Sequence, residues 1–157
     1  LEQLSHWQLS GKMAIITAQQ KGSARVNWQQ NGDDYRLNLT SLIGTHILEL
    51  PRSKGEITLI DNEGSPHQSQ DAEALLYQLT GWNIPVQGLP EWIKGLPGKA
   101  EFELNPDSSL ASVRDGQWQI VYGDYRDQDG YRLPHLLTMT GQGSRLKLQI
   151  NQWTLAR

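Results

Sequence analysis

Apolar and polar residues alternate along several separate stretches of this chain. In residues 24–29 and 145–150 the even positions are apolar and the odd positions polar, and in residues 35–40 the odd positions are apolar. Residues 101–104 and 117–122 repeat this pattern with few exceptions. Successive side chains of a β-strand point to opposite faces, so each stretch predicts a strand with one buried face. The chain is therefore expected to form a sheet that is solvated on one side.

Turn-forming residues separate these stretches at intervals of roughly 8–12 residues, the spacing of an antiparallel meander. They are Lys21-Gly22, Asn31-Gly32, Ser41 to Gly44, Ser53-Lys54-Gly55 and Asn62-Glu63-Gly64. Asn31-Gly32 is the strongest of these signals, because a type I′ turn needs positive φ at both central residues. Many strands of this kind curl into a barrel or half-barrel. The predicted fold class is mainly β, within the broader α+β class.

The middle of the chain follows a different period. Four apolar residues fall at helical spacing, namely Ala72, Leu75, Leu76 and Leu79. Ser69 or Asp71 can cap the start of this helix, and Gly81 can end it. A second short helix is predicted from Pro90 to Lys94, with proline in its first turn. A helical pair on the concave side of a curved sheet can act as a lid. The alternative is a pair of ordinary helices that complete the core.

One turn carries apolar residues where Asn, Asp, Gly or Ser are usual. Leu42-Ile43-Gly44 lies between strand patterns at 35–40 and 46–50, and the apolar phase changes from odd to mainly even positions across it. This change of phase indicates that the chain turns here. Burying each large side chain would be worth roughly 1.5–3 kcal/mol, so leaving both exposed suggests an apolar partner. The alternative is that the strand continues and both side chains belong to the core.

Composition excludes several classes of function. The 157 residues fit one domain with a substantial core, and the net charge of −3 offers no electrostatic surface for nucleic acid or an anionic bilayer. The sequence has no cysteine, which excludes disulfides, thiol catalysis and cysteine-based zinc sites. It also contains no apolar run long enough to span a membrane. No signal peptide begins at Leu1, which carries no information if the chain is a trimmed mature form.

Patterns for catalysis and metal binding are sparse. The four histidines are scattered and show no metalloprotease spacing. Gly141-Gln142-Gly143-Ser144 matches neither a nucleophile elbow nor a dinucleotide fingerprint. Asp127-Gln128-Asp129-Gly130 resembles part of a calcium loop, but the EF-hand positions that require carboxylates fall on Tyr125 and Leu136, so a turn is predicted. No catalytic residue, metal or cofactor is therefore expected.

A series of short motifs runs through nearly the whole chain. They are Trp28 to Gly32, Tyr35 to Leu37, Gly44 to Leu50, Asp71 to Glu73, Leu79 to Gly81, Ile84-Pro85, Trp92-Ile93, Gly95 to Gly98, Val121 to Gly123 and Asn151 to Trp153. In this order they resemble the LolB family, the outer-membrane lipoprotein receptors of Gram-negative bacteria. The Gly-Leu-Pro-Gly sequence after a tryptophan is the most specific of them.

This resemblance implies a single lipoprotein-binding domain over residues 1–157. It implies an antiparallel half-barrel of about eleven strands, with lid helices at about residues 70–96 over an apolar cavity. The implied function is that of a receptor, not an enzyme, which accepts lipoproteins from the soluble periplasmic carrier LolA and inserts them into the outer membrane. The implied partners are LolA, lipoprotein acyl chains and outer-membrane lipid, for a monomer that binds no nucleic acid. A lipidated N-terminal cysteine, absent from this sequence, would anchor it at the periplasmic face of the outer membrane.

The alternating apolar faces and the helical pair are expected to line the acyl cavity. The expected lining residues are Met13, Ile15, Val26, Trp28, Leu37, Leu39, Leu48, Leu50, Ile57, Leu59, Leu76, Leu79, Ile93, Trp118, Ile120, Leu137, Met139, Leu146 and Leu148. The family's protruding apolar loop falls on Ser41 to Gly44. Ile43 aligns with the loop's key leucine, and Leu42 occupies a neighbouring position that can be proline. Leu42, Ile43 and Gly44 are therefore expected to form a membrane-insertion loop.

Physical chemistry is consistent with a transfer protein. An acyl chain that leaves a bilayer for water loses about 0.8 kcal/mol per CH₂, so an apolar cavity is needed to protect it. Direction can come from differential affinity alone, without ATP. The alternative is a soluble carrier of lipoproteins or other apolar ligands without insertion activity, which would have no reason to expose Leu42 and Ile43. A hydrolase would need a nucleophile and a base, for which only scattered candidates such as Ser5 and His6 exist.

Overall fold

The computed structural model describes residues 4–18, 21–41, 46–53, 56–68, 71–141 and 143–155. Within these residues the elements follow one another as β1 (His6–Thr17), β2 (Lys21–Asn31), β3 (Asp34–Thr40), β4 (His46–Ser53), β5 (Glu56–Ile60), β6 (Pro66–Gln68), α1 (Ala72–Thr80), α2 (Leu89–Trp92), β7 (Glu101–Leu104), β8 (Leu110–Asp115), β9 (Trp118–Gln128), β10 (Tyr131–Gly141) and β11 (Ser144–Leu155).

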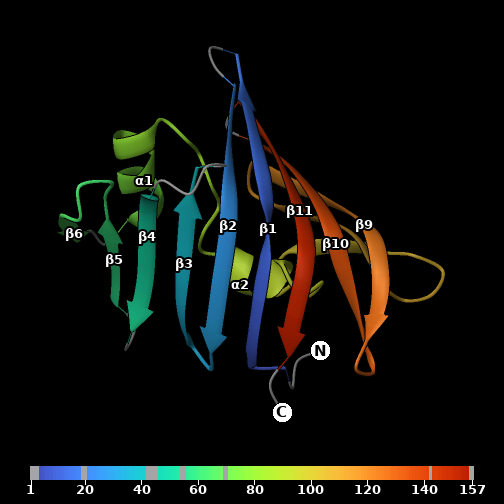
Figure 1. The fold of residues 1–157 in the computed structure, drawn as a ribbon. Coiled ribbons are helices and arrows are strands. Elements are labelled where there is room, and N and C mark those ends of the chain that lie inside the picture. Colours follow the sequence, from blue (N-terminus) through green and yellow to red (C-terminus); the bar gives the residue numbers. More distant parts are fainter. Residues whose placement is uncertain are drawn as a thin grey trace.

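The strands of the described residues form one open antiparallel sheet of 11 strands, which confirms the predicted fold class. Their order is β6-β5-β4-β3-β2-β1-β11-β10-β9-β8-β7. The first and last strands therefore lie side by side in the middle of the sheet, with Trp7 opposite Leu155. The sheet is curved, and both helices lie on its concave side (Figure 1). The two edges, β6 and β7, do not meet, so the structure is a half-barrel.

The alternation of apolar and polar residues determines which face of a strand is buried. In β2 every second side chain from Ala24 to Gln30 is buried and the residues between them are exposed. Neighbouring strands keep the same phase, because Val26 pairs with Leu39 and Leu39 pairs with Leu48. Directly opposite residues of paired strands share a face. The buried faces and the helices thus enclose one apolar core on the concave side.

The turn between β2 and β3 differs from the predicted one. Asn31 pairs with Asp34, so the two central residues are Gly32 and Asp33, not Asn31 and Gly32. Gly32 has a φ of 63°, and a glycine with positive φ at the first central position suits a type II′ turn. The hairpin was predicted correctly, but the register of its turn was one residue off.

The edge strand β7 also departs from the expectation of one buried face. All four of its side chains are exposed, including Phe102 at 51% and Leu104 at 54%. The alternation of Glu101 to Leu104 correctly indicates a strand. Among the described residues no further strand pairs with β7, so it is an edge of the sheet, and its apolar side chains are half exposed there.

The helix ends follow the predicted capping residues closely. The Asp71 carboxylate accepts a hydrogen bond from the Ala74 N–H at 3.0 Å, and Gly81 ends α1 with a φ of 77°. Ser69 lies outside the described residues. The second helix begins one residue earlier than predicted and ends at Trp92. Neither helix is long enough to cross a membrane.

Aromatic side chains fill the interior near one end of the sheet. The Trp7 ring lies 5.9 Å from that of Trp28 and 5.2 Å from that of Trp153, and Trp28 lies 4.9 Å from Tyr35. The Trp28 indole N–H donates to Gln30 at 2.8 Å. Trp7, Trp28 and Trp153 are therefore core residues at this end of the sheet, and Gln30 is the polar residue beside them.

Candidate functional site

The interior wall of the half-barrel contains most of the residues predicted to line a cavity. The structure buries them together in one apolar cluster: Met13, Ile15, Val26, Trp28, Leu37, Leu39, Leu48, Leu50, Leu59, Leu76, Ile93, Trp118, Ile120, Leu137, Met139, Leu146 and Leu148. Ile57 is half-buried against this cluster. The Leu79 side chain and the loop residues Leu42, Ile43 and Gly44 lie outside the described residues.

A pocket of about 800 Å³ opens beside this cluster. It lies between the turn from β2 to β3, the end of β4 and the residues around α2. Its apolar lining consists of Leu4, Ile57, Val86, Pro90, Leu96 and Pro97. Ile57 belongs both to this lining and to the set predicted from the sequence. The volume falls within the range of typical small-molecule sites, roughly 300–1,000 Å³.

The pocket rim is polar and carries charges of both signs. Arg52, Lys94 and Lys99 contribute cations, and Asp33 and Glu91 contribute carboxylates. Arg52 donates a hydrogen bond to the backbone carbonyl of Asp33, and the Lys94 ammonium donates to the Leu4 carbonyl at 3.0 Å. The pocket thus combines an apolar wall with hydrogen-bond donors at its mouth, an arrangement suited to a ligand with an apolar and a polar part.

Gly98 is required where the chain folds back along this rim. Its φ is 61°, and a Cβ at this position would lie 2.7 Å from a carboxylate oxygen of Glu91. The left-handed backbone would strain any other residue here, and the flexible Glu91 carboxylate would also have to move aside. The backbone conformation of Gly98 explains the last glycine of the Gly-Leu-Pro-Gly motif.

Two polar contacts, the first of them buried, hold the helical segment (residues 71–100) in place. The Tyr122 hydroxyl of β9 donates to the Trp92 carbonyl at 2.6 Å. Burial raises the pKa of Tyr122 well above its usual value, so the hydroxyl keeps its proton at neutral pH. The Glu73 carboxylate of α1 accepts from the Gln87 N–H at 3.1 Å, and burial raises the pKa of Glu73. The first contact ties α2 to the sheet, and the second ties α1 to the connection between the helices.

Replacing Tyr122 by phenylalanine tests the contact between α2 and the sheet. Tyr122→Phe should lower the free energy of unfolding by about 1–3 kcal/mol, because the Trp92 carbonyl loses its buried donor. Urea denaturation measures this change. Tyr77→Phe is the matched control, since Tyr77 is 52% exposed on α1. Equal stability of the two variants would show that Tyr122 does not anchor the helical segment.

The geometry gives little support to a catalytic or metal-binding role. The Ser5 hydroxyl and His6 Nδ1 are 3.0 Å apart, but the pair is exposed and formed by adjacent residues. Asp129 and Gly130 form the turn between β9 and β10, both with positive φ. Among the described residues no three carboxylate or histidine side chains come together as a metal site.

Sequence reasoning missed most of the pocket lining. Several of the missed residues lie at or just beyond strand ends, where alternation gives no information on what covers them. They are Leu4, Gln30, Tyr35 and Arg52. Outside the short helix α2, residues 86–99 follow no helical or strand period, so their place around the pocket depends on tertiary structure. The glycines and prolines of this stretch were the available signal, because they mark a chain of irregular shape.

Comparison with known proteins agrees with this architecture. Among solved structures, a DUF1329 family protein from Desulfovibrio piger has a TM-score of 0.66 with 7% identity, covering 98% of this chain and 87% of that one. A LolA superfamily protein from Nitrosomonas europaea has a TM-score of 0.64 with 8% identity, covering 99% of this chain and 88% of that one. At these identities the likeness shows the fold alone.

Sequence relatives are far more similar. Outer-membrane lipoprotein LolB of Aeromonas salmonicida is 97% identical over all 157 residues, which make up 81% of that protein. LolB of Aeromonas hydrophila is 94% identical and LolB of Tolumonas auensis 48% identical, with the same coverage. A family model described as outer membrane lipoprotein LolB matches residues 5–153. The chain therefore belongs to the LolB family of outer-membrane lipoproteins.

Proposed function

We propose that this protein is an outer-membrane receptor that accepts lipoproteins from LolA, holds their acyl chains in its interior and inserts them into the outer membrane. The observation that carries this proposal is membership of the LolB family over residues 5–153. The open half-barrel supports it, because its concave side carries one large apolar cluster. Binding and transfer need no bond to be made or broken, so we assign no catalytic residue.

The pocket beside α2 provides an entrance for acyl chains. Its apolar wall adjoins the interior cluster through Ile57, and its rim offers Lys94, Lys99 and Arg52 to the ester and amide carbonyls of a lipoprotein head group. Movement of the helical segment would widen the interior, and each CH₂ that enters gains about 0.8 kcal/mol. In this proposal the residues predicted to line the cavity form the site into which the chains move.

The direction of transfer follows from affinity differences. A receptor that binds the acyl chains more tightly than the carrier, and less tightly than the membrane, passes cargo one way without nucleotide. We further propose that the protein acts as a monomer at the periplasmic face of the outer membrane. The relatives at 94% and 97% identity are longer than this chain, which spans 81% of each, and a lipidated cysteine in that additional length would provide the anchor.

A soluble carrier of lipoproteins is the second candidate function. The LolA superfamily likeness, with a TM-score of 0.64, favours it only through the shared fold. The apolar pair Leu42 and Ile43 discriminates between the two, since a carrier that never meets the membrane gains nothing from exposing them.

Titration with a triacylated lipopeptide that carries a fluorophore tests the proposal. The lipopeptide should bind to this protein, and a peptide of the same sequence without acyl chains should not. Equal affinity for both peptides would contradict an acyl-binding site.

A further inference from the structure

The outer edge of β7 is an open strand that presents two different faces. Phe102 lies opposite Val113, which lies opposite Ile120, and both of these partners are buried. Phe102 therefore continues the apolar inner wall to the very edge of the sheet, where it is half exposed. Glu101 and Glu103 point to the other face, opposite Arg114 and Ser112. The edge is thus apolar inside and acidic outside.

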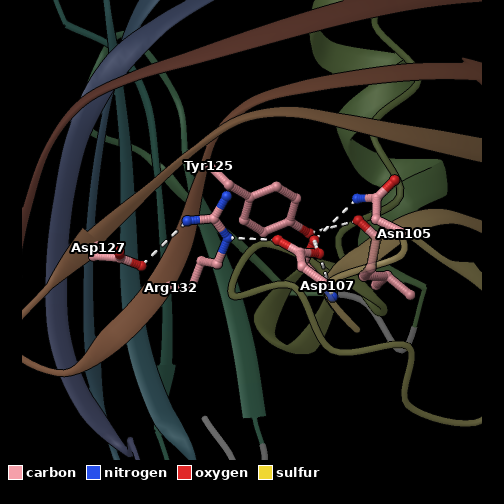
Figure 2. Close-up of polar contacts among 7 residues, drawn as sticks. Asn105, Asp107, Tyr125, Asp127 and Arg132 are labelled. Atoms are coloured by element: carbon pink, nitrogen blue, oxygen red, sulfur yellow. Dashed lines mark hydrogen bonds and ion pairs between the residues drawn. The ribbon is translucent and has the colours of Figure 1, made fainter.

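A polar network fixes the hairpin that carries this edge. Arg132 of β10 bonds Asp107 in the turn between β7 and β8 at 2.9 Å and Asp127 at 3.2 Å. The Tyr125 hydroxyl donates to the Leu110 carbonyl at 2.6 Å, and the Arg132 guanidinium lies over the Tyr125 ring. Figure 2 shows these groups joining the turn to β9 and β10. Hydrogen bonds from Ser109, with a further contribution from Arg132, lower the pKa of Asp107, so its carboxylate stays charged.

An ordered open edge favours the addition of a strand. The backbone groups along the free side of an edge strand are a template for pairing with another chain. Because the network already holds the hairpin, little conformational entropy is lost when a partner strand binds. Short acidic edges also protect sheets from aggregation. However, protection alone does not explain why Phe102 and Leu104 are 51% and 54% exposed at the same place.

We propose that β7 pairs with the edge strand of the carrier's half-barrel, which would have apolar side chains inside and basic side chains outside. This inference rests on the proposed function, since it names the surface through which the carrier docks. The LolA superfamily structure shares the open-sheet fold, so such a carrier also has a free edge. Pairing of the two edges would join both inner faces into one apolar wall. An acyl chain could then pass between the proteins without crossing water.

Two pairs of variants test this surface. Phe102→Glu places a charge on the inner side of the edge, and Val121→Glu is its control, because Val121 is 48% exposed on the outer face of β9. Glu103→Lys reverses the charge of the edge, and Glu63→Lys is its control at the turn between β5 and β6, near the opposite edge. The measurements are the rate of lipoprotein transfer from LolA and the affinity for the acylated lipopeptide.

Phe102→Glu and Glu103→Lys should each slow transfer roughly tenfold, while the lipopeptide affinity and the transfer rates of both controls stay at the level of the unchanged protein. If the unchanged protein takes cargo from LolA and both edge variants take it equally fast, the docking surface is wrong and the proposed function stands. An equal loss of lipopeptide affinity and transfer rate would also overturn it, because the edge would then belong to the cavity. If the unchanged protein takes no cargo from LolA, the proposed function fails and the docking surface fails with it.

Discussion

Leu39→Glu should abolish binding of the acylated lipopeptide. Leu39 is fully buried in the middle of the inner wall, between Val26 of β2 and Leu48 of β4. A carboxylate there is removed from water without a partner, which we expect to lower the free energy of unfolding by more than about 4 kcal/mol. Circular dichroism and lipopeptide titration measure the two effects. Asn27→Glu is the matched control, because Asn27 is exposed on the outer face of β2.

A milder variant keeps this test decisive if Leu39→Glu fails to fold. Val26→Thr replaces one methyl group of the inner wall by a hydroxyl with little change in side-chain shape. It should fold and bind the lipopeptide several-fold more weakly. If a folded Leu39→Glu or Val26→Thr variant binds as tightly as the unchanged protein, acyl chains do not enter the interior, and the pocket alone is the site.

Ile43→Glu should separate receipt of cargo from its delivery. β3 ends at Thr40 and β4 begins at His46, at the end of the sheet opposite the turn from β2 to β3 that lines the pocket. An apolar residue there gains free energy by entering the bilayer interface, and a glutamate loses that gain. Transfer from LolA should stay near normal, while delivery to liposomes falls by about an order of magnitude. Leu42→Glu should have the same effect if both residues act, or a smaller one if Ile43 dominates.

Asn62→Glu provides the control for this experiment. It adds the same charge at an exposed turn between β5 and β6 and should change neither receipt nor delivery. Normal delivery by Ile43→Glu would mean that the loop has no part in insertion. The soluble-carrier function would then be favoured.

The predictions from sequence succeed where local chemistry decides the structure. Alternation identifies the buried face of β2 because all inward-facing residues from Ala24 to Gln30 meet the core and all outward-facing residues meet solvent. Asp71 and Gly81 mark the ends of α1 because a capping carboxylate and a left-handed residue act within one helical turn. The hairpin at Gly32 was found for a similar reason, although the sequence does not distinguish two turns that are one residue apart.

The predictions fail where contacts between residues distant in the sequence determine the structure. Asp124 has a φ of 51°, which breaks the alternation of β9 and brings Tyr125 to the same side as Tyr122, with their rings 6.3 Å apart. A bulge opposite Ser10 and Gly11 likewise returns Trp153 to the inner face of β11. Neither irregularity has a strong local signal. The pocket, assembled from strand ends and residues 86–99, shares only Ile57 with the predicted lining among the described residues.

Transfer of a lipoprotein between two purified proteins tests whether this protein receives cargo from LolA. LolA carrying a labelled lipoprotein is mixed with this protein without nucleotide, and the two proteins are separated to locate the label. The lipoprotein is expected to move to this protein and not to return to empty LolA. Cargo that stays on LolA, or that moves only when ATP is added, would contradict it.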